Sequence, residues 1–187
     1  MNPMPRIHTF FEMRLEEGGT APFCLTTVST DGFPNSRFVD LKSVTQDGLL
    51  FGTDERSAKA IEFRKRNQVA ACLWWERLSV QIRVQGTIRK ASSELSDRVF
   101  AKRNVTAQAI ATVSIQSGDL LDEGGLKRQV AERVTSSPGG LPRPGTWWVF
   151  EIVPVTVEIL EFSEDRIHQR TKFTLVGDAW TSKRLNP

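Results

Sequence analysis

The chain has 187 residues, of which 39% are hydrophobic and 25% charged, a balance typical of one soluble globular domain with a sizeable core. Its net charge of +3, with acidic and basic residues interleaved, suits a small anionic ligand at least as well as a nucleic acid. No apolar run is long enough to span a membrane and the N-terminus lacks a signal-peptide pattern, so we expect a cytoplasmic protein. Cys24 and Cys72 lie in apolar, strand-like stretches and are expected to be reduced and buried.

In the first half of the chain, short strand-like segments alternate with turn signals. The expected elements are a helix over 9–17 ended by Gly18-Gly19, strands over 23–29 and 36–44 around a turn at 30–32, a strand at 49–51 after a turn at 46–48, a helix over 57–66, and strands over 69–75 and 78–88. In the second helix, Ala60, Ile61 and Phe63 are expected to face inward. Short strands joined by tight turns favour an antiparallel β-barrel over a parallel sheet.

Helices predominate after residue 90. The expected elements there are a helix from the cap Ser93 to about Arg103, a further turn or two over 107–114, a loop at 118–125, a helix over 126–134, and strands over 147–153, 155–162 and 166–175. No internal repeat or long linker divides the chain. The sequence therefore predicts one domain over residues 1–187, mainly β with peripheral helices (α+β), with a helical N-terminal segment at 1–20.

Several common catalytic and binding motifs are absent from the sequence. It has no glycine-rich dinucleotide fingerprint, no phosphate-binding loop ending in Gly-Lys-Ser/Thr, and no nucleophile elbow. The only histidines, His8 and His168, lie far apart, and neither has a cysteine pair nearby. We therefore expect no zinc site and no other bound metal.

Two segments combine cations with a strand-like pattern. The run 37–42 carries Arg37 and Lys42 at the ends of Phe-Val-Asp-Leu, and a strand that borders an anionic ligand can use both cations, whereas a plain core strand gains nothing from them. The run 51–59 then leads from a strand end into a helix and contains Thr53 and Lys59. A hydroxyl, backbone N–H groups and a lysine are thus placed where a phosphate could sit.

Two further polar segments are less specific. Gln81, Arg83 and Gln85 alternate along one face of a strand, which taken alone fits a half-exposed strand equally well. The loop 114–118 contains Gln116 and Ser117 and, on its own, favours a simple turn.

Near the C-terminus, Arg166, His168 and Arg170 are expected to share one face of a strand. Three potential cations on one face repel one another unless an anion or a carboxylate lies opposite. This trio is therefore expected to have a functional role.

Taken in chain order, these segments resemble the pyridoxamine 5′-phosphate oxidase family of FMN-dependent oxidases. The resemblance covers about residues 20–187, through the runs 37–42, 51–59, 74–86, 116–117, 166–170 and the closing 180–187. Each motif is weak singly, but their order and spacing make the set fairly specific. The resemblance implies a homodimer of split antiparallel β-barrels, with FMN bound across the subunit interface and residues 163–187 forming a substrate-binding and dimerisation segment.

The resemblance also implies a set of FMN-binding residues. Arg37 and Lys59 would meet the FMN phosphate with Thr53 close by, and Gln81 would hydrogen-bond the flavin. The whole implied set is Arg37, Phe38, Val39, Asp40, Leu41, Lys42, Gly52, Thr53, Lys59, Gln81, Gln116, Ser117 and Arg170, with some members supplied by the partner subunit.

For the substrate, the resemblance implies pyridoxamine or pyridoxine 5′-phosphate, oxidised to pyridoxal 5′-phosphate with O2 as the acceptor and release of hydrogen peroxide. Lys42 and Arg103 would bind the substrate phosphate. Arg166 and His168 would be the catalytic pair that orients the substrate ring against the flavin.

The sequence departs from the family pattern at several positions. Val99 and Ala107 stand where the family often has a tyrosine and a serine that help to bind the substrate phosphate, so two hydrogen-bond donors are missing, each worth about 0.5–1.5 kcal/mol. Ser163 stands for a flavin-contacting tryptophan, Ala58 for a basic residue and Gly52 for a tyrosine. The loop before the last motif is also shorter by several residues.

These departures leave two alternatives open. One is a related flavoenzyme with another substrate, for example a phenazine-pathway oxidase. The other is a non-catalytic flavin- or haem-binding protein on the same barrel. Neither a nucleic acid nor a membrane is expected as a partner.

Overall fold

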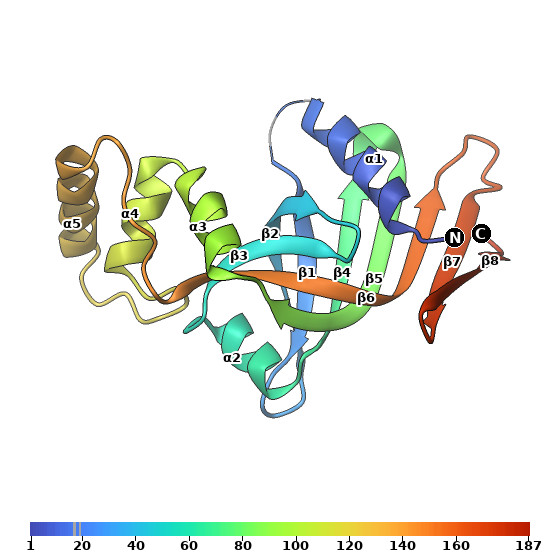
Figure 1. The fold of residues 1–187 in the computed structure, drawn as a ribbon, viewed down its shortest axis with the longest axis horizontal. Helices are drawn as coiled ribbons and strands as arrows, with labels where there is room; N and C mark the ends of the chain where they lie inside the picture. The colour runs from blue at the N-terminus through green and yellow to red at the C-terminus, as the bar shows by residue number, and fades with distance from the viewer. Residues whose placement is uncertain (17, 19) are drawn as a thin grey trace.

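The structure, a computed structural model, describes residues 1–16, 18 and 20–187. Its elements, in chain order, are α1 (Met4–Glu16), β1 (Pro22–Val28), β2 (Pro34–Val44), β3 (Leu49–Asp54), α2 (Ala58–Lys65), β4 (Gln68–Trp75), a short 3-10 turn (Glu76–Leu78), β5 (Val80–Lys90), α3 (Ser93–Ala101), α4 (Val105–Val113), α5 (Glu123–Ser136), β6 (Trp147–Glu161), β7 (Gln169–Val176) and β8 (Ala179–Leu185). Figure 1 shows a β-barrel in the middle, with α3, α4 and α5 projecting on one side and the β7–β8 hairpin on the opposite side.

The strands form one antiparallel sheet that closes on itself. Its order is β3-β2-β1-β4-β5-β6-β7-β8, and an additional β3–β6 pairing joins the ends of the first six strands into a barrel. The first half of the 15-residue β6 pairs with β3, its second half pairs with β7, and β5 runs along most of its length. The predicted antiparallel barrel with peripheral helices is therefore confirmed.

Alternating burial along the strands fills the barrel with apolar side chains. In β1, Phe23 and Leu25 are fully buried, while Cys24 between them is half-buried on the outer face. Phe51 on β3 lies at the centre, with its ring 5.9 Å from Phe23 and 6.1 Å from Phe150. Helix α2 adds Phe63, whose ring centroid lies 4.8 Å from that of Phe150. These contacts fix α2 against the barrel and so position its first turn.

The prediction of an inward-facing position is wrong for one residue of α2. Ala60 and Phe63 are buried as expected, but the side chain of Ile61 is 43% exposed. At 3.6 residues per turn, residues 59, 60, 62 and 63 share the side that faces the barrel, and residue 61 points away from it. The inward positions therefore include Lys59 and Glu62, which are charged.

The structure corrects the prediction of two strands over 147–162. β6 continues through Pro154, which pairs with Gly86 where the register shifts next to Gln85. Proline cannot donate a ladder hydrogen bond, and such an irregularity removes the need for one. A side chain at Gly86 would not fit, because its Cβ would lie 2.2 Å from the carbonyl oxygen of Val153.

Several element boundaries differ from the prediction. α1 begins at Met4 rather than residue 9, and the side chain of Ser92, not Ser93, caps α3 by accepting from the Leu95 N–H. α3 ends at Ala101, and β8 was not predicted as a strand. Of the residues expected to end α1, Gly18 has φ +79°, as a helix-ending glycine often has, and Gly19 lies outside the described residues.

The two cysteines are free and lie opposite each other in the β1–β4 register. Both are half-buried rather than buried as expected, because they belong to the outward-facing positions of their strands.

Candidate functional site

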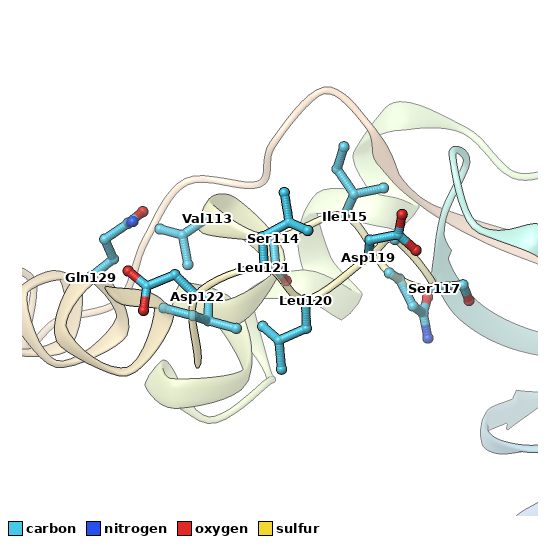
Figure 2. Close-up of a pocket in the computed structure, with 12 residues that line it drawn as sticks. Val113, Ser114, Ile115, Ser117, Asp119, Leu120, Leu121, Asp122 and Gln129 are labelled. Atoms are coloured by element: carbon cyan, nitrogen blue, oxygen red, sulfur yellow. The ribbon is translucent and has the colours of Figure 1, made fainter. Parts of the chain in front are cut away.

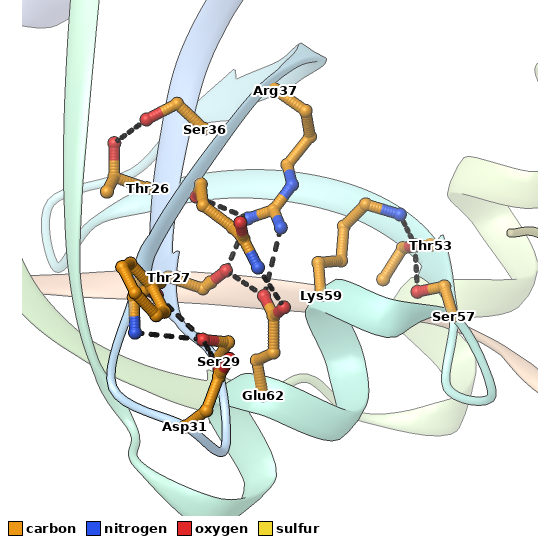
Figure 3. Close-up of polar contacts among 12 residues, drawn as sticks. Thr26, Thr27, Ser29, Asp31, Ser36, Arg37, Thr53, Ser57, Lys59 and Glu62 are labelled. Carbon is orange, nitrogen blue, oxygen red and sulfur yellow. Dashed lines mark hydrogen bonds and ion pairs between the residues drawn. The ribbon is translucent and has the colours of Figure 1, made fainter.

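Residues from β3, α2 and the loop after α4 meet at one end of the barrel. Lys59 Nζ donates a hydrogen bond of 3.2 Å to Thr53 Oγ1, which in turn donates to Gln116 Oε1 over 2.8 Å. The Ser57 hydroxyl lies 3.3 Å from the same Thr53 oxygen. Figure 3 shows Lys59 extending from α2 toward Thr53, with the Arg37 side chain reaching into the same region from β2. Four residues of the implied FMN set, Arg37, Thr53, Lys59 and Gln116, thus gather within one protomer.

The two cations of this cluster are held in different ways. Lys59 is 5% exposed, and its burial, together with the field of Arg37, lowers its pKa to about 8, although the carboxylates Asp54 and Glu62 oppose the shift. Arg37 is only partly buried and makes an ion pair, with its Nη2 2.9 Å from Glu62 Oε2. A cation kept next to another cation in a dry site is stabilised by any anion that binds there.

The start of α2 adds to this positive potential. Ser57 is its N-cap residue, but its hydroxyl makes no capping hydrogen bond and points to Thr53 instead. The first turn of the helix contains no acidic residue. Unpaired N–H groups at a helix start favour an anion. Two cations, two hydroxyls and a helix start therefore fit a phosphate group.

A second site lies beside α3. Lys42 of β2 and Arg103, just after α3, line one cavity of about 390 Å³, and Val99 is in its wall. The full lining is Lys42, Ser43, Thr45, Leu50, Leu95, Arg98, Val99, Lys102 and Arg103. Lys42 makes an ion pair with Asp40, whose other carboxylate oxygen is buried without a partner. The structure therefore brings Lys42 and Arg103 to one cavity, and their role in substrate binding stays a prediction.

Arg103 is the notable cation of this cavity. Burial lowers its pKa, and the nearby carboxylate of Asp40 opposes that shift. Its Nη2 donates 3.2 Å to the Ala107 carbonyl, while its Nε is buried with no hydrogen-bond partner. Among the described residues it has no ion-pair partner within 4.0 Å, so it is available to an external anion.

Trp147 accounts for one departure from the family pattern. A Cβ at Gly52 would lie 2.1 Å from Cζ2 of Trp147, whose buried indole fills the space beside β3. The Arg103 guanidinium lies 5.1 Å from the centre of the same indole. Gly52, Arg103, Gln116 and Trp147 also line a smaller cavity of about 180 Å³. None of the motifs singled out in the sequence includes Trp147.

The outer face of the barrel carries Gln81 and Arg170. Gln81, Arg83 and Gln85 occupy the more exposed positions of β5, which confirms that they share a face. Gln81 is opposite Leu160 of β6, and Leu160 is opposite Arg170 of β7, so the two polar residues stand in one row across the sheet. Glu158 Oε1 holds Arg170 Nε at 3.0 Å.

The expected trio on one strand face is wrong. β7 begins at Gln169, so Arg166 and His168 lie in the loop before it, and only Arg170 is on the strand. Arg166 has φ +62° and is exposed, while His168 Nδ1 accepts from the Ser163 N–H over 3.2 Å. Three turn residues were taken as strand because their alternation of polar and apolar side chains mimics a two-residue period.

The two implied substrate-binding pairs do not meet within one protomer. Figure 1 places α3, next to Lys42 and Arg103, on the opposite side of the barrel from the β6–β7 loop that carries Arg166 and His168. Phe38, of the implied flavin-lining strand, is 76% exposed. A complete site therefore requires a second surface.

Gln116 and Ser117 also border a cavity of about 530 Å³ between the 114–122 loop and α5 (Figure 2). Its walls are formed mainly by that loop, including the exposed Leu120 and Leu121. Its lining residues include no lysine or arginine, so it lacks the character of a phosphate site.

Two classes of site are absent from the part of the chain that the structure describes. No group of three or more His, Cys, Asp or Glu side chains there is arranged to bind a metal ion. No helix of the described residues is both long and apolar enough to cross a membrane.

Comparison with known proteins decides the family. The family described as "Pyridoxamine 5'-phosphate oxidase" matches residues 12–137, and the "Pyridoxine 5'-phosphate oxidase C-terminal dimerisation region" matches residues 147–187. The chain belongs to the pyridoxamine 5′-phosphate oxidase family. Family membership makes it an oxidoreductase of this type and indicates a flavin cofactor, and the match to the dimerisation region supports a homodimer.

Relatives of known sequence support the same assignment. The "Pyridoxine/pyridoxamine 5'-phosphate oxidase" of Legionella pneumophila (strain Lens) is 32% identical over 191 residues, which cover 100% of this chain and 88% of the relative. The protein of the same name from Caulobacter vibrioides (strain NA1000 / CB15N) is 36% identical over 164 residues, covering 87% of this chain and 74% of the relative.

Solved structures support the fold. PhzG from Burkholderia lata, crystallised with tetrahydrophenazine-1-carboxylic acid, superposes with a TM-score of 0.91 at 24% identity, covering 100% of this chain and 93% of that one. A pyridoxamine 5'-phosphate oxidase-related, FMN-binding protein from Nostoc punctiforme has a TM-score of 0.82 at 19% identity, covering 100% and 99%. At these identities the likeness concerns the fold alone.

Proposed function

We propose that this protein is an FMN-dependent oxidase that converts pyridoxamine or pyridoxine 5′-phosphate into pyridoxal 5′-phosphate, with O2 reduced to hydrogen peroxide. With the amine substrate, water also supplies the aldehyde oxygen and the nitrogen leaves as ammonia. The observation that carries this proposal is the cluster of Arg37, Thr53 and Lys59, in which a buried lysine and an arginine lie side by side with hydroxyl groups. Such a cluster is costly to form in a dry site unless an anion occupies it.

FMN would be held by this cluster and by the outer face of the barrel. Arg37 and Lys59 would bind its phosphate together with Thr53, while Gln81 and Arg170 would address the polar edge of the ring. Phe38, Val39, Asp40, Leu41 and Lys42 on β2, together with Gly52, Gln116 and Ser117, would complete the site. Gln116 bonds Thr53 of its own protomer, which supports a phosphate end that would be assembled within one chain.

The substrate would be held between two protomers. Arg103 and Lys42 would bind its phosphate in the cavity beside α3, and Arg166 and His168 of the second protomer would orient its ring. Bound FMN would supply the acceptor for a hydride from the carbon that carries the amine or alcohol, and O2 would take up the two electrons to give hydrogen peroxide. The protein contributes binding, orientation and exclusion of water.

The experiment is to purify the protein, record its flavin absorbance and assay peroxide release from pyridoxamine 5′-phosphate. A yellow protein with FMN released on denaturation, and one peroxide formed per aldehyde, is the expected result. A colourless protein that does not take up added FMN would contradict the proposal.

A second candidate is an FMN-dependent oxidase of the same family that acts on a different substrate, such as an aromatic carboxylic acid. The cavity beside α3 favours it, because Val99 brings an apolar wall where the family often has a phenol, and Asp40 already neutralises part of the charge of Lys42. Arg98 and Lys102 add cations at its rim. A panel of aromatic carboxylic acids tested against pyridoxamine 5′-phosphate for turnover separates the two candidates.

We also infer a cytoplasmic location from Cys24 and Cys72, which face each other across two strands as free cysteines. Alkylation of both thiols in extracts made without reductant is the expected result.

A further inference from the structure

We propose that Glu62 is the positioning residue of the phosphate site, because its carboxylate fixes the Arg37 guanidinium in the place from which Arg37 and Lys59 together meet one phosphate. This inference rests on the proposed binding of FMN and goes beyond it, since no sequence motif assigned a role to Glu62. The residue is charged and lies on the barrel-facing side of α2, with its side chain only 9% exposed.

Three donors from two strands hold the Glu62 carboxylate. Its Oε2 accepts from Arg37 Nη2 over 2.9 Å and also from the buried hydroxyl of Thr27, and its Oε1 accepts from Asn35 Nδ2 over 2.7 Å. Burial alone would raise the pKa of Glu62, but these hydrogen bonds outweigh it and lower the pKa, so the group stays ionised at neutral pH. Figure 3 shows the carboxylate below the guanidinium, enclosed by these side chains.

The same network restricts Arg37. Its Nη1 donates to the Thr27 hydroxyl and, over 2.9 Å, to the carbonyl oxygen of Asn35, while Nη2 donates to Glu62. A guanidinium has five N–H groups in a fixed plane. The three bonds therefore fix that plane and leave the Nε–H and one N–H of Nη2 for an external acceptor.

Helix α2 links this network to the second cation. Lys59 and Glu62 are three residues apart on its inward side, so one turn of helix presents both. Lys59 Nζ reaches Thr53 on β3, and Glu62 reaches the β1–β2 side. Glu62 also lowers the combined charge of Arg37 and Lys59 and thereby their mutual repulsion before an anion binds. The site is thus preorganised by a carboxylate that does not itself meet the phosphate.

The test compares the dissociation constants of FMN and of riboflavin, which lacks the phosphate, for wild type and Glu62→Gln. Glutamine keeps the shape but carries no charge, and whichever way its amide points, its NH2 group faces one of the three donors, so the ion pair that fixes Arg37 is lost. We expect FMN binding to weaken by about tenfold or more while riboflavin binding stays within about twofold. Fluorescence quenching of either flavin on binding gives both constants without any turnover.

Glu151→Gln is the matched control. Glu151 is also a largely buried glutamate that pairs with an arginine, Arg89, and accepts from a threonine, Thr45, over 2.9 Å, but it belongs to a separate network at the β2–β3 turn. In the Glu151→Gln variant, the ratio of FMN affinity to riboflavin affinity should equal that of wild type. If Glu62→Gln fails to fold, Thr27→Val, which cuts the bridge between Arg37 and Glu62, takes its place with the same expected direction.

A double-variant cycle gives the decisive reading. Because Glu62 acts through Arg37, the loss of FMN affinity caused by Glu62→Gln should disappear in an Arg37→Ala background. Two results would overturn the role of Glu62 while leaving FMN binding in place. One is an undiminished loss of FMN affinity in the Arg37→Ala background. The other is a ratio of FMN affinity to riboflavin affinity that is unchanged or raised in Glu62→Gln alone. A wild-type protein that binds riboflavin as tightly as FMN would overturn both this inference and the proposed phosphate site.

Discussion

The two proposed anion sites of this protein are built differently. The cluster around Lys59 is complete within one chain, since Arg37, Thr53 and Gln116 reach it from three elements of the same protomer. The cavity around Arg103 is incomplete, because Arg166 and His168 lie on the other side of the barrel and two phosphate-binding donors of the family are replaced by Val99 and Ala107. From this difference we expect that cofactor binding and substrate binding can vary independently on this barrel.

The largest expected effect comes from Lys59→Met, which tests whether the first site binds a phosphate. Loss of a buried, charge-assisted contact should raise the FMN dissociation constant by about 100-fold and leave riboflavin binding nearly unchanged. Equilibrium dialysis with each flavin measures both. Lys65→Met, at the exposed end of the same helix, is the control, and equal weakening of both flavins by Lys59→Met would contradict a phosphate contact.

Arg103→Met should have the next largest effect and a different signature. Removing the unpaired guanidinium should raise KM for pyridoxamine 5′-phosphate by about 30-fold, with little change in FMN content. Steady-state kinetics measures KM, and flavin absorbance measures the FMN content of the same preparation. A parallel loss of FMN would mean that the two sites are not independent.

Arg166→Ala isolates the other half of the substrate site. Its side chain lies in the β6–β7 loop, so we expect kcat to fall by about tenfold through poorer orientation of the substrate, while flavin content stays at the wild-type level. Turnover per bound flavin is the measurement. Equal losses of flavin and activity would indicate a structural role.

Restoring the two missing hydrogen-bond donors tests the substrate site by a gain of binding rather than by a loss. Val99→Tyr with Ala107→Ser should lower KM for pyridoxamine 5′-phosphate by up to about tenfold if this phosphate is the ligand of the cavity. No change, together with turnover of another aromatic acid, would favour the second candidate function.

The smallest expected effect is a pH dependence of FMN binding. Burial, and next the charge of Arg37, lower the pKa of Lys59 to about 8 against the opposing effect of Asp54 and Glu62. The lysine is therefore protonated at pH 7 and loses its proton as the pH rises through 8. FMN affinity should therefore fall about fourfold between pH 7 and pH 8.5, with proton uptake on binding above pH 8. The FMN phosphate is already fully ionised near pH 7, so its own titration does not offset this trend. In Lys59→Met the slope should vanish.

The antiparallel barrel was predictable because turn residues and two-residue periods are local signals. The hairpin at 30–32 and the paired strands β4 and β5 were predicted on those grounds and confirmed. The trio at 166–170 failed because the same alternation occurs by chance in a turn. The strand break expected at Pro154 failed because a register shift against Gly86, on a strand far away in sequence, accommodates the proline.

The amino-acid sequence by itself predicted the class of ligand that we propose, because the order of its cations and hydroxyls resembles that of a family that binds phosphates. Only the tertiary structure decided which of these side chains meet, and it added residues that no motif marks: Glu62, Asn35 and Thr27 around Arg37, and Trp147 in the space beside Gly52. The reason is physical, because burial and a partner's distance depend on elements that are remote along the chain, whereas helix and strand periodicity depends on neighbours.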